Sequence, residues 1–369
     1  MRTRYANWMY SWETRLTMRD TNRVVRPFEW GLEWTRDFPY VNGNYPAEAA
    51  DMERYFHALN EKLVAHSDEF FSYKPPADYR VERRPAMRMG TGQNALPEPD
   101  QPEIAEFLRF TSPVRTPYPE NDLVNARWFP AKNPNSCAMV VMPQWNSDAF
   151  GHNALCKIFN WFGISALRLS KPYHDVRKPG EIERADYAVS ANVGRTLSAA
   201  RQAVIDVRCC LDWLQQQGYK RFGVLGTSLG SCYAFIASAH DQRLEVNAFN
   251  HASTYFADVV WTGQSTRHIR EGIEHAISLD SLRKSWLAIS PMAYFDKFAR
   301  WPKKSLIVYA KYDLTFLPEF SQHVVEEFQK WKLDAKVAVL PCGHYTTGET
   351  PYKYMDAWHL GRFVKNAFR

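Results

Sequence analysis

Residues 221–240 read RFGVLGTSLGSCYAFIASAH, with a serine at position 228 between two nearby glycines. The apolar run before the serine is typical of a buried strand, and the residues after it favour a helix. A sharp strand-to-helix turn projects its serine side chain, and Gly226 and Gly230 give such a turn the room it needs. A flexible loop serine is the alternative for the five-residue motif alone. The strand before it and the helix after it instead predict a nucleophile elbow that presents Ser228.

From about residue 104 onward, apolar runs of strand length alternate with helical patterns. Two of these runs, at 106–112 and 121–129, predict an antiparallel strand pair. Six more predict buried strands: 137–142, 164–169, 221–226, 246–250, 305–310 and 336–340. Such alternation indicates an α/β fold with a mostly parallel sheet and helices on both of its faces.

Two polar residues follow later strands in the order that a catalytic triad on this architecture requires. Asp313 comes directly after the strand predicted at 305–310, and His344 follows the strand predicted at 336–340. A serine hydroxyl needs a base to remove its proton, and that base needs a carboxylate to orient it. Taken singly, the aspartate fits a turn or a helix cap, and the histidine fits a polar loop. Together with Ser228 at a third strand end, they predict a Ser228–His344–Asp313 triad.

With these residues in place, the chain from about 104 to 369 resembles the α/β-hydrolase superfamily of esterase- and lipase-like serine hydrolases. The resemblance rests on three motifs: GTSLGS (226–231), YAKYDLTFLP (309–318) and LPCGHY (340–345). It implies a mostly parallel eight-stranded sheet, a Ser-His-Asp triad and no cofactor or metal. It also implies a helical lid inserted after the sixth strand, for which residues 253–301 are the candidate.

The resemblance further implies an oxyanion hole made of two backbone N–H groups. One is that of Leu229, at the start of the helix after the serine, where N–H groups face developing negative charge. The other is expected in the loop after the third strand, where the family often carries His-Gly-x. This chain has MPQWNSD (142–148) there, which makes Trp145 the candidate, with Gln144 and Asn146 as alternatives.

Residues 1–102 are expected to form an N-terminal extension packed on, or linked to, the hydrolase domain at 103–369. Their one clear element is a helix from about residue 46 to 66 with an apolar stripe. The proline-rich stretch at 74–103 predicts an irregular linker, and its cluster of arginines predicts a solvated loop rather than a nucleic-acid site. GTGQNA (90–95) partly matches a dinucleotide-binding glycine pattern but lacks a preceding strand.

Composition indicates the compartment of the protein and the kinds of partner it lacks. The net charge of +6 is spread along the chain, and the six cysteines show no framework spacing. No apolar run reaches the roughly 18 residues that a membrane-spanning helix requires. We therefore expect a reduced, cytoplasmic protein with no integral membrane segment and no nucleic-acid partner. PYHD (172–175) suggests a metal or acid–base site, but with no ligand-spaced partner a loop shaping the pocket is the better interpretation.

The expected activity is hydrolysis of a carboxylic ester, through an acyl-enzyme, on a small-molecule substrate with an apolar part. A peptidase, thioesterase or acyltransferase uses the same triad and stays an alternative. A non-catalytic binding protein on the hydrolase fold is a further alternative, although such a protein has no need for all three triad residues.

Overall fold

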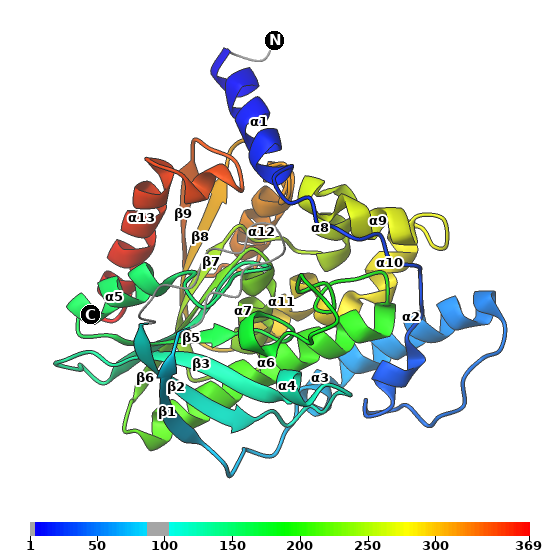
Figure 1. The fold of residues 1–369 in the computed structure, drawn as a ribbon, viewed down its shortest axis with the longest axis horizontal. Helices are drawn as coiled ribbons and strands as arrows, with labels where there is room; N and C mark the ends of the chain where they lie inside the picture. Colours follow the sequence, from blue (N-terminus) through cyan, green and yellow to red (C-terminus); the bar gives the residue numbers. More distant parts are fainter. Residues whose placement is uncertain (1–3, 87–102) are drawn as a thin grey trace.

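The computed structural model describes residues 4–86 and 103–369, which form a nine-stranded sheet with helices on both faces (Figure 1). The strand order across the sheet is β1-β2-β3-β5-β4-β6-β7-β8-β9. The bounds of the strands are β1 Arg80–Pro85, β2 Ile104–Thr111, β3 Leu123–Phe129, β4 Cys137–Met142, β5 Ser165–Ser170, β6 Arg221–Thr227, β7 Leu244–Asn250, β8 Lys304–Ala310 and β9 Ala335–Leu340.

The sheet is antiparallel at one side and parallel over the rest. β1 pairs with β2, β2 with β3 and β3 with β5, all antiparallel. From β5 onward every neighbouring pair is parallel. The antiparallel pair and the six further strands expected from the sequence are thus present, and the carboxyl ends of β6, β7, β8 and β9 meet at one edge. The strand predicted at 336–340 is not buried, however, because β9 is an edge strand that exposes Val337 and Val339.

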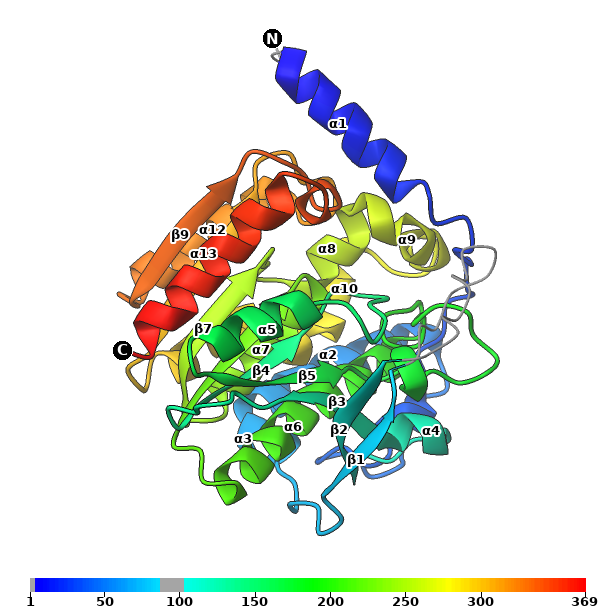
Figure 2. The same cartoon turned by 60° about the vertical axis from the view of Figure 1, so that its left-hand side comes forward.

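Two buried apolar clusters lie on the two faces of the sheet. One joins the sheet to α5 (Asn153–Trp161) and α13 (Tyr352–Ala367), and Met9 of α1 (Arg4–Thr17) belongs to it. The other joins it to α6 (Val193–Gln216), α7 (Leu229–Ala239) and α12 (Pro318–Lys330). The two groups of helices lie on opposite sides of the strands in Figure 2.

The remaining helices belong to an insertion, to the N-terminal part and to one short turn before β3. The inserted helices lie between β7 and β8, as expected for the 253–301 segment, and are α8 Phe256–Thr262, α9 Arg267–Ile273, α10 Leu279–Ser285 and α11 Phe295–Phe298. The others are α2 Ala49–Ala65, α3 Ser67–Phe70 and α4 Pro119–Asp122. The helix predicted at 46–66 is therefore confirmed as α2, and it packs on α10.

The structure corrects two expectations about the N-terminal part. Residues 80–85 form the edge strand β1, so the predicted linker contains a ninth strand, and Arg80, Arg83 and Arg84 lie on that strand rather than in a loop. This strand carries a single apolar side chain, Val81, and forms because β2 offers it an open edge with unpaired backbone groups. The glycine motif at 90–95 lies outside the described residues.

Helix α1 is the second correction, because the sequence prediction contained no helix there. Its buried residues do follow helical spacing, but the set includes Glu13 and Thr17, while Tyr5 and Trp8 are exposed. A helix that buries polar residues and exposes aromatic ones does not show the usual amphipathic pattern.

All six cysteines are free and buried in this fold. Among residues 4–86 and 103–369, no helix is long and apolar enough to cross a membrane.

Candidate active site

The turn around Ser228 is so tight that only glycine fits at positions 226 and 230, two residues before and two residues after the serine. Ser228 has a φ of 56°, and its N–H donates to the carbonyl of Asn250 at 2.7 Å. A Cβ atom on Gly226 would lie 2.1 Å from the carbonyl oxygen of Gly230, and one on Gly230 would lie 2.3 Å from that of Met142. Because all of these neighbours are backbone atoms, the strand-to-helix bend cannot relax to admit a side chain. The bend leaves Ser228 at the carboxyl edge of β6.

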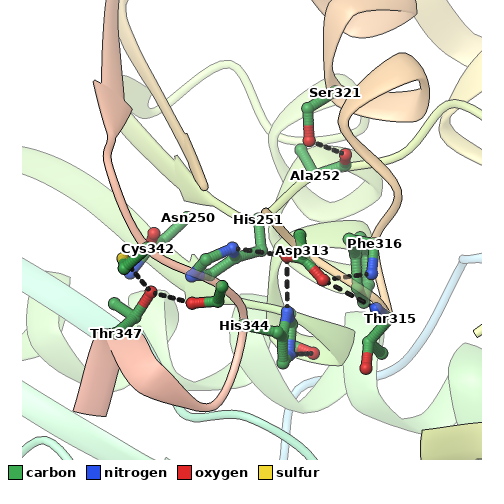
Figure 3. Close-up of polar contacts among 12 residues, drawn as sticks. Asn250, His251, Ala252, Asp313, Thr315, Phe316, Ser321, Cys342, His344 and Thr347 are labelled. Atoms are coloured by element: carbon green, nitrogen blue, oxygen red, sulfur yellow. Dashed lines mark hydrogen bonds and ion pairs between the residues drawn. The ribbon is translucent and has the colours of Figure 1, made fainter. Parts of the chain in front are cut away.

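The three residues expected to form a triad are joined by two consecutive hydrogen bonds, with His344 in the middle. The Oγ of Ser228 lies 3.0 Å from Nε2 of His344, and Nδ1 of His344 lies 2.9 Å from Oδ2 of Asp313. The other carboxylate oxygen of Asp313 accepts the N–H groups of Thr315 and Phe316 at 2.7 and 2.8 Å. Figure 3 shows Asp313 held between these donors. The arrangement lets a proton pass from the serine to an imidazole whose orientation is fixed by a buried carboxylate.

Electrostatics favour the ionised aspartate and the protonated histidine. Burial alone would raise the pKa of Asp313, but the charge of His344 and two histidine hydrogen bonds outweigh it and hold the pKa well below its usual range. Burial would lower the pKa of His344, whereas the charge of Asp313 and its hydrogen bond raise it overall. A base with a raised pKa in contact with a serine hydroxyl is suited to general-base catalysis.

A second histidine, which the sequence reasoning missed, shares the same carboxylate oxygen. His251 follows β7, and its Nδ1 lies 3.0 Å from Oδ2 of Asp313, with its ring centroid 4.5 Å from that of His344 (Figure 3). Burial and the charge of His344 lower the pKa of His251, which favours its neutral form, and its hydrogen bond to Asp313 opposes the shift. A histidine at a strand end is the one signal the sequence offered.

The ligand atoms of His251, Asp313 and His344 lie within 4.8 Å of one another, a spacing that a metal ion would also produce. Hydrogen bonds explain the grouping without one, because both Nδ1 atoms lie within 3.0 Å of the same oxygen. We therefore interpret the group as a hydrogen-bonded array.

The loop after β4 faces the serine turn and carries the candidate second oxyanion donor. Gln144, Trp145 and Asn146 line the same cavity as Ser228 and Leu229. The indole N–H of Trp145 donates to the carbonyl of Ala185 at 2.9 Å, and the side-chain oxygen of Asn146 accepts the N–H of Ala185 at 2.7 Å.

The fully buried Lys171 holds this loop in place through hydrogen bonds to its backbone. Its ammonium donates to the carbonyls of Pro143 and Gln144 at 2.7 and 2.9 Å. Burial lowers its pKa well below the usual value for lysine. Two backbone carbonyls of the loop are thereby satisfied, which fixes the path of the loop beside the serine turn.

The N-terminal helix α1 contributes to the site through Glu13. This buried carboxylate accepts the N–H groups of Tyr345 and Thr346 at 2.7 and 3.0 Å, and the hydroxyl of Thr346 at 3.1 Å. A Cβ on Gly343 would lie 2.4 Å from the Glu13 carboxylate, so the helix fits closely against the loop that carries His344. Sequence reasoning missed this residue because the contact joins positions more than 300 apart in the chain.

A cavity of about 880 Å³ contains Ser228 and His344 in its wall. Its lining is mainly apolar and comes from the inserted segment, from α5 and from α13, with Val259, Leu155 and Leu360 as examples. None of the PYHD residues lines it. His174 is buried with its Nδ1 2.8 Å from the carbonyl of Pro172, and Asp175 accepts the Ser170 hydroxyl, so that segment supports the fold rather than shaping the pocket.

Among the residues that line the cavity, Asp356 is a carboxyl group with an unusual environment. Asp356, on α13, accepts the side-chain N–H of Asn250 at 2.9 Å, and its second oxygen is enclosed without a hydrogen-bond partner. Burial raises the pKa of Asp356 to about 7, although the bond from Asn250 opposes the shift.

No family model matches the chain, and no curated protein matches it. Solved structures do resemble it at the level of the backbone. An acetyl xylan esterase from Thermoanaerobacterium shares 14% identity over 93% of this chain and all of its own, with a TM-score of 0.55. An acetyl xylan esterase from Paenibacillus shares 12% identity over 90% of this chain and 98% of its own, with a TM-score of 0.54.

A third similar structure is the acylaminoacyl peptidase of Pyrococcus horikoshii, which shares 10% identity with a TM-score of 0.55. The match covers 78% of this chain and 48% of that longer one. Identities this low establish a common fold and not a common substrate. Together with the sheet order and the serine turn, they show that this chain has the α/β-hydrolase fold.

Proposed function

We propose that this protein is a serine hydrolase that cleaves a carboxylic ester through an acyl-enzyme intermediate. One observation carries the proposal: an uninterrupted relay from Ser228 through His344 to Asp313, with distances of 3.0 and 2.9 Å, in the wall of the large cavity. A protein that only binds a ligand does not need a hydroxyl, a base and a buried carboxylate joined by successive hydrogen bonds.

In this mechanism His344 takes the proton of Ser228 as the serine oxygen attacks the ester carbonyl. Asp313 keeps the imidazole in the required tautomer and stabilises its cation. The tetrahedral oxyanion accepts the backbone N–H groups of Leu229 and Trp145. Leu229 opens α7, so its N–H belongs to the first turn, where N–H groups have no partner within the helix. His344 then protonates the leaving alcohol, and water releases the acyl group by the same steps.

The pocket supports a small ester with an apolar part, because its lining is mainly apolar next to the serine. The helical insertion at 253–301 acts as the lid in this proposal, since Phe256, Val259 and Val260 line the cavity. Residues 1–102 act as part of the hydrolase unit, through the Glu13 contact and the ninth strand. The six free cysteines fit a reducing compartment such as the cytoplasm.

The direct test is labelling by a fluorophosphonate probe together with turnover of p-nitrophenyl esters. Ser228→Ala should abolish labelling and lower kcat by about 10⁴-fold or more, as for other triad serines. Ser265→Ala is the matched control, because Ser265 is buried and lines the same cavity outside the relay. Labelling or turnover that survives in Ser228→Ala contradicts the assignment.

A panel of substrates distinguishes the proposed esterase activity from peptidase, thioesterase or acyltransferase activity with the same triad. Esters of increasing acyl length are compared with acyl-thioesters and aminoacyl-amides on the purified protein. The proposal expects the highest kcat/KM with an oxygen ester, and a clear preference for an amide or thioester contradicts it.

A further inference from the structure

The cavity that contains Ser228 continues to the outer surface between two helices. Its lining includes Ala154 and Ile158 of α5 and Tyr354 and Ala357 of α13, and the Tyr354 side chain is 64% exposed. A side chain that both lines a cavity and faces solvent marks an opening. In Figure 2 the two helices run over the same side of the sheet.

Large apolar side chains are exposed on the same two helices. Trp161 at the end of α5 is 81% exposed, and Trp358 on α13 is 55% exposed. Tyr354 and Trp358 are four residues apart on one helix, so they lie on one stripe, and Met355 is exposed beside them. Soluble proteins rarely expose large apolar side chains in a group, and an exposed group of them marks an interaction site.

The same two helices carry more basic than acidic residues. The four lysines and arginines on these two helices are Lys157, Lys353, Arg362 and Lys365. Against them α5 and α13 carry one acidic residue, Asp356, which is bound inward to Asn250. The Arg362 guanidinium lies 5.0 Å from the Trp358 ring, and the Lys365 ammonium lies 4.8 Å from the Phe162 ring, so positive charge and aromatic rings are interleaved. We call this set of aromatic and basic side chains the α5–α13 face.

We propose that the α5–α13 face docks on an anionic lipid bilayer, so that ester-linked acyl chains reach Ser228 from the bilayer through the opening between the two helices. Tryptophan and tyrosine concentrate at the membrane–water interface, where an apolar ring and a polar edge are both satisfied. Clustered lysines and arginines add attraction to anionic headgroups. Three of the four cations are lysines, which are depleted in protein–protein interfaces but complement anionic headgroups, so a bilayer is favoured over a protein partner. The docking stands on the surface alone, whereas the delivery of acyl chains rests on the proposed hydrolase activity.

The test is cosedimentation of the full chain with vesicles of phosphatidylcholine, with and without about a third phosphatidylglycerol. We compare the wild type with Trp358→Ser/Arg362→Gln, neither residue of which lines the cavity. The matched control is Trp331→Ser/Lys332→Gln, an exposed pair at the end of α12, on the opposite face of the sheet. Each protein is also assayed on a soluble short-chain ester.

The wild type should bind the anionic vesicles and lose binding as salt screens the attraction. The α5–α13 variant should bind about tenfold more weakly, while the control and all soluble-ester activities stay unchanged. Absence of binding to anionic vesicles, or equal loss in the two double variants, overturns the proposal. So does a wild type whose α5–α13 face instead mediates self-association that the variant abolishes. Repeating the binding with Ser228→Ala separates docking from catalysis, since a failed hydrolase proposal leaves vesicle binding intact.

Discussion

Two carboxylates near Ser228 lie in enclosed surroundings but have pKa values shifted in opposite directions. Asp313, in the loop after β8, has donors on both oxygens: two backbone N–H groups on one and two imidazoles on the other. Asp356, on α13, has one amide donor on one oxygen and none on the other. The pKa of the first is held well below its usual range, and that of the second is raised to about 7.

The difference follows from what opposes burial at each group: neighbouring charge and several hydrogen bonds at Asp313, and a single hydrogen bond at Asp356. Burial penalises the ionised form of both groups, and only Asp313 receives enough hydrogen bonds and positive charge to overcome it. The loop after β8 is therefore suited to hold a permanent negative charge beside a base. The wall at α13 presents a carboxyl group that changes charge near neutral pH.

The largest effect should come from reversing the hydrogen-bonding character of the first carboxylate. In Asp313→Asn the new amide directs donors at two imidazole N–H groups, which forces His344 into the wrong tautomer. We expect kcat to fall by about 10³–10⁴-fold, with the fold retained by circular dichroism. A variant that keeps more than a tenth of the activity would show that His344 does not depend on Asp313.

The second-largest effect should be a change in the pH dependence of the free energy of unfolding when Asp356 is replaced. Its folded pKa of about 7 lies above the unfolded value near 3.9, so its contribution to stability is complete below pH 4 and is lost as pH rises towards 7. Asp356→Asn removes this dependence. The free energy of unfolding of the wild type should fall relative to the variant by about 2–4 kcal/mol between pH 4 and 7.

Urea denaturation at several pH values measures that difference. The matched control is Asp334→Asn, because Asp334 is exposed and does not line the cavity. A constant difference between the wild type and Asp356→Asn across pH 4–7 would contradict the raised pKa.

The smallest effect should come from His251, which moderates the first carboxylate. Removing its donor in His251→Ala concentrates the charge of Asp313 on His344 and raises the pKa of His344 further. The acid limb of kcat/KM should then move to higher pH by about half a unit, with kcat lowered by about tenfold or less.

His251→Asn is the matched variant, because its amide keeps a donor and asparagine tolerates the φ of 54° at this position. Its acid limb should stay near that of the wild type. If both variants shift equally, or if the limb of His251→Ala moves to lower pH, His251 does not act by sharing the carboxylate.

Much of the fold was predictable, because strands buried on both faces are recognisable as short apolar runs. Every strand of the parallel part was expected within a few residues. The edge strand β1 and helix α1 were not, since neither has an apolar pattern of its own. Each is held by a neighbour: β2 supplies backbone partners to β1, and the loop that carries His344 supplies hydrogen-bond donors to Glu13 on α1.

The residues that lie at the strand ends could be identified from the amino-acid sequence. Gly226, Ser228 and Gly230 specify a turn through local sterics, and Asp313 and His344 follow strands whose apolar runs place them at the same edge. Their surroundings depend on how the chain folds, and these include the second imidazole on Asp313, the glutamate from α1 and the opening between α5 and α13. Local bends and strands depend on neighbours in the chain, whereas hydrogen-bond donors and exposed faces depend on which distant segments pack together.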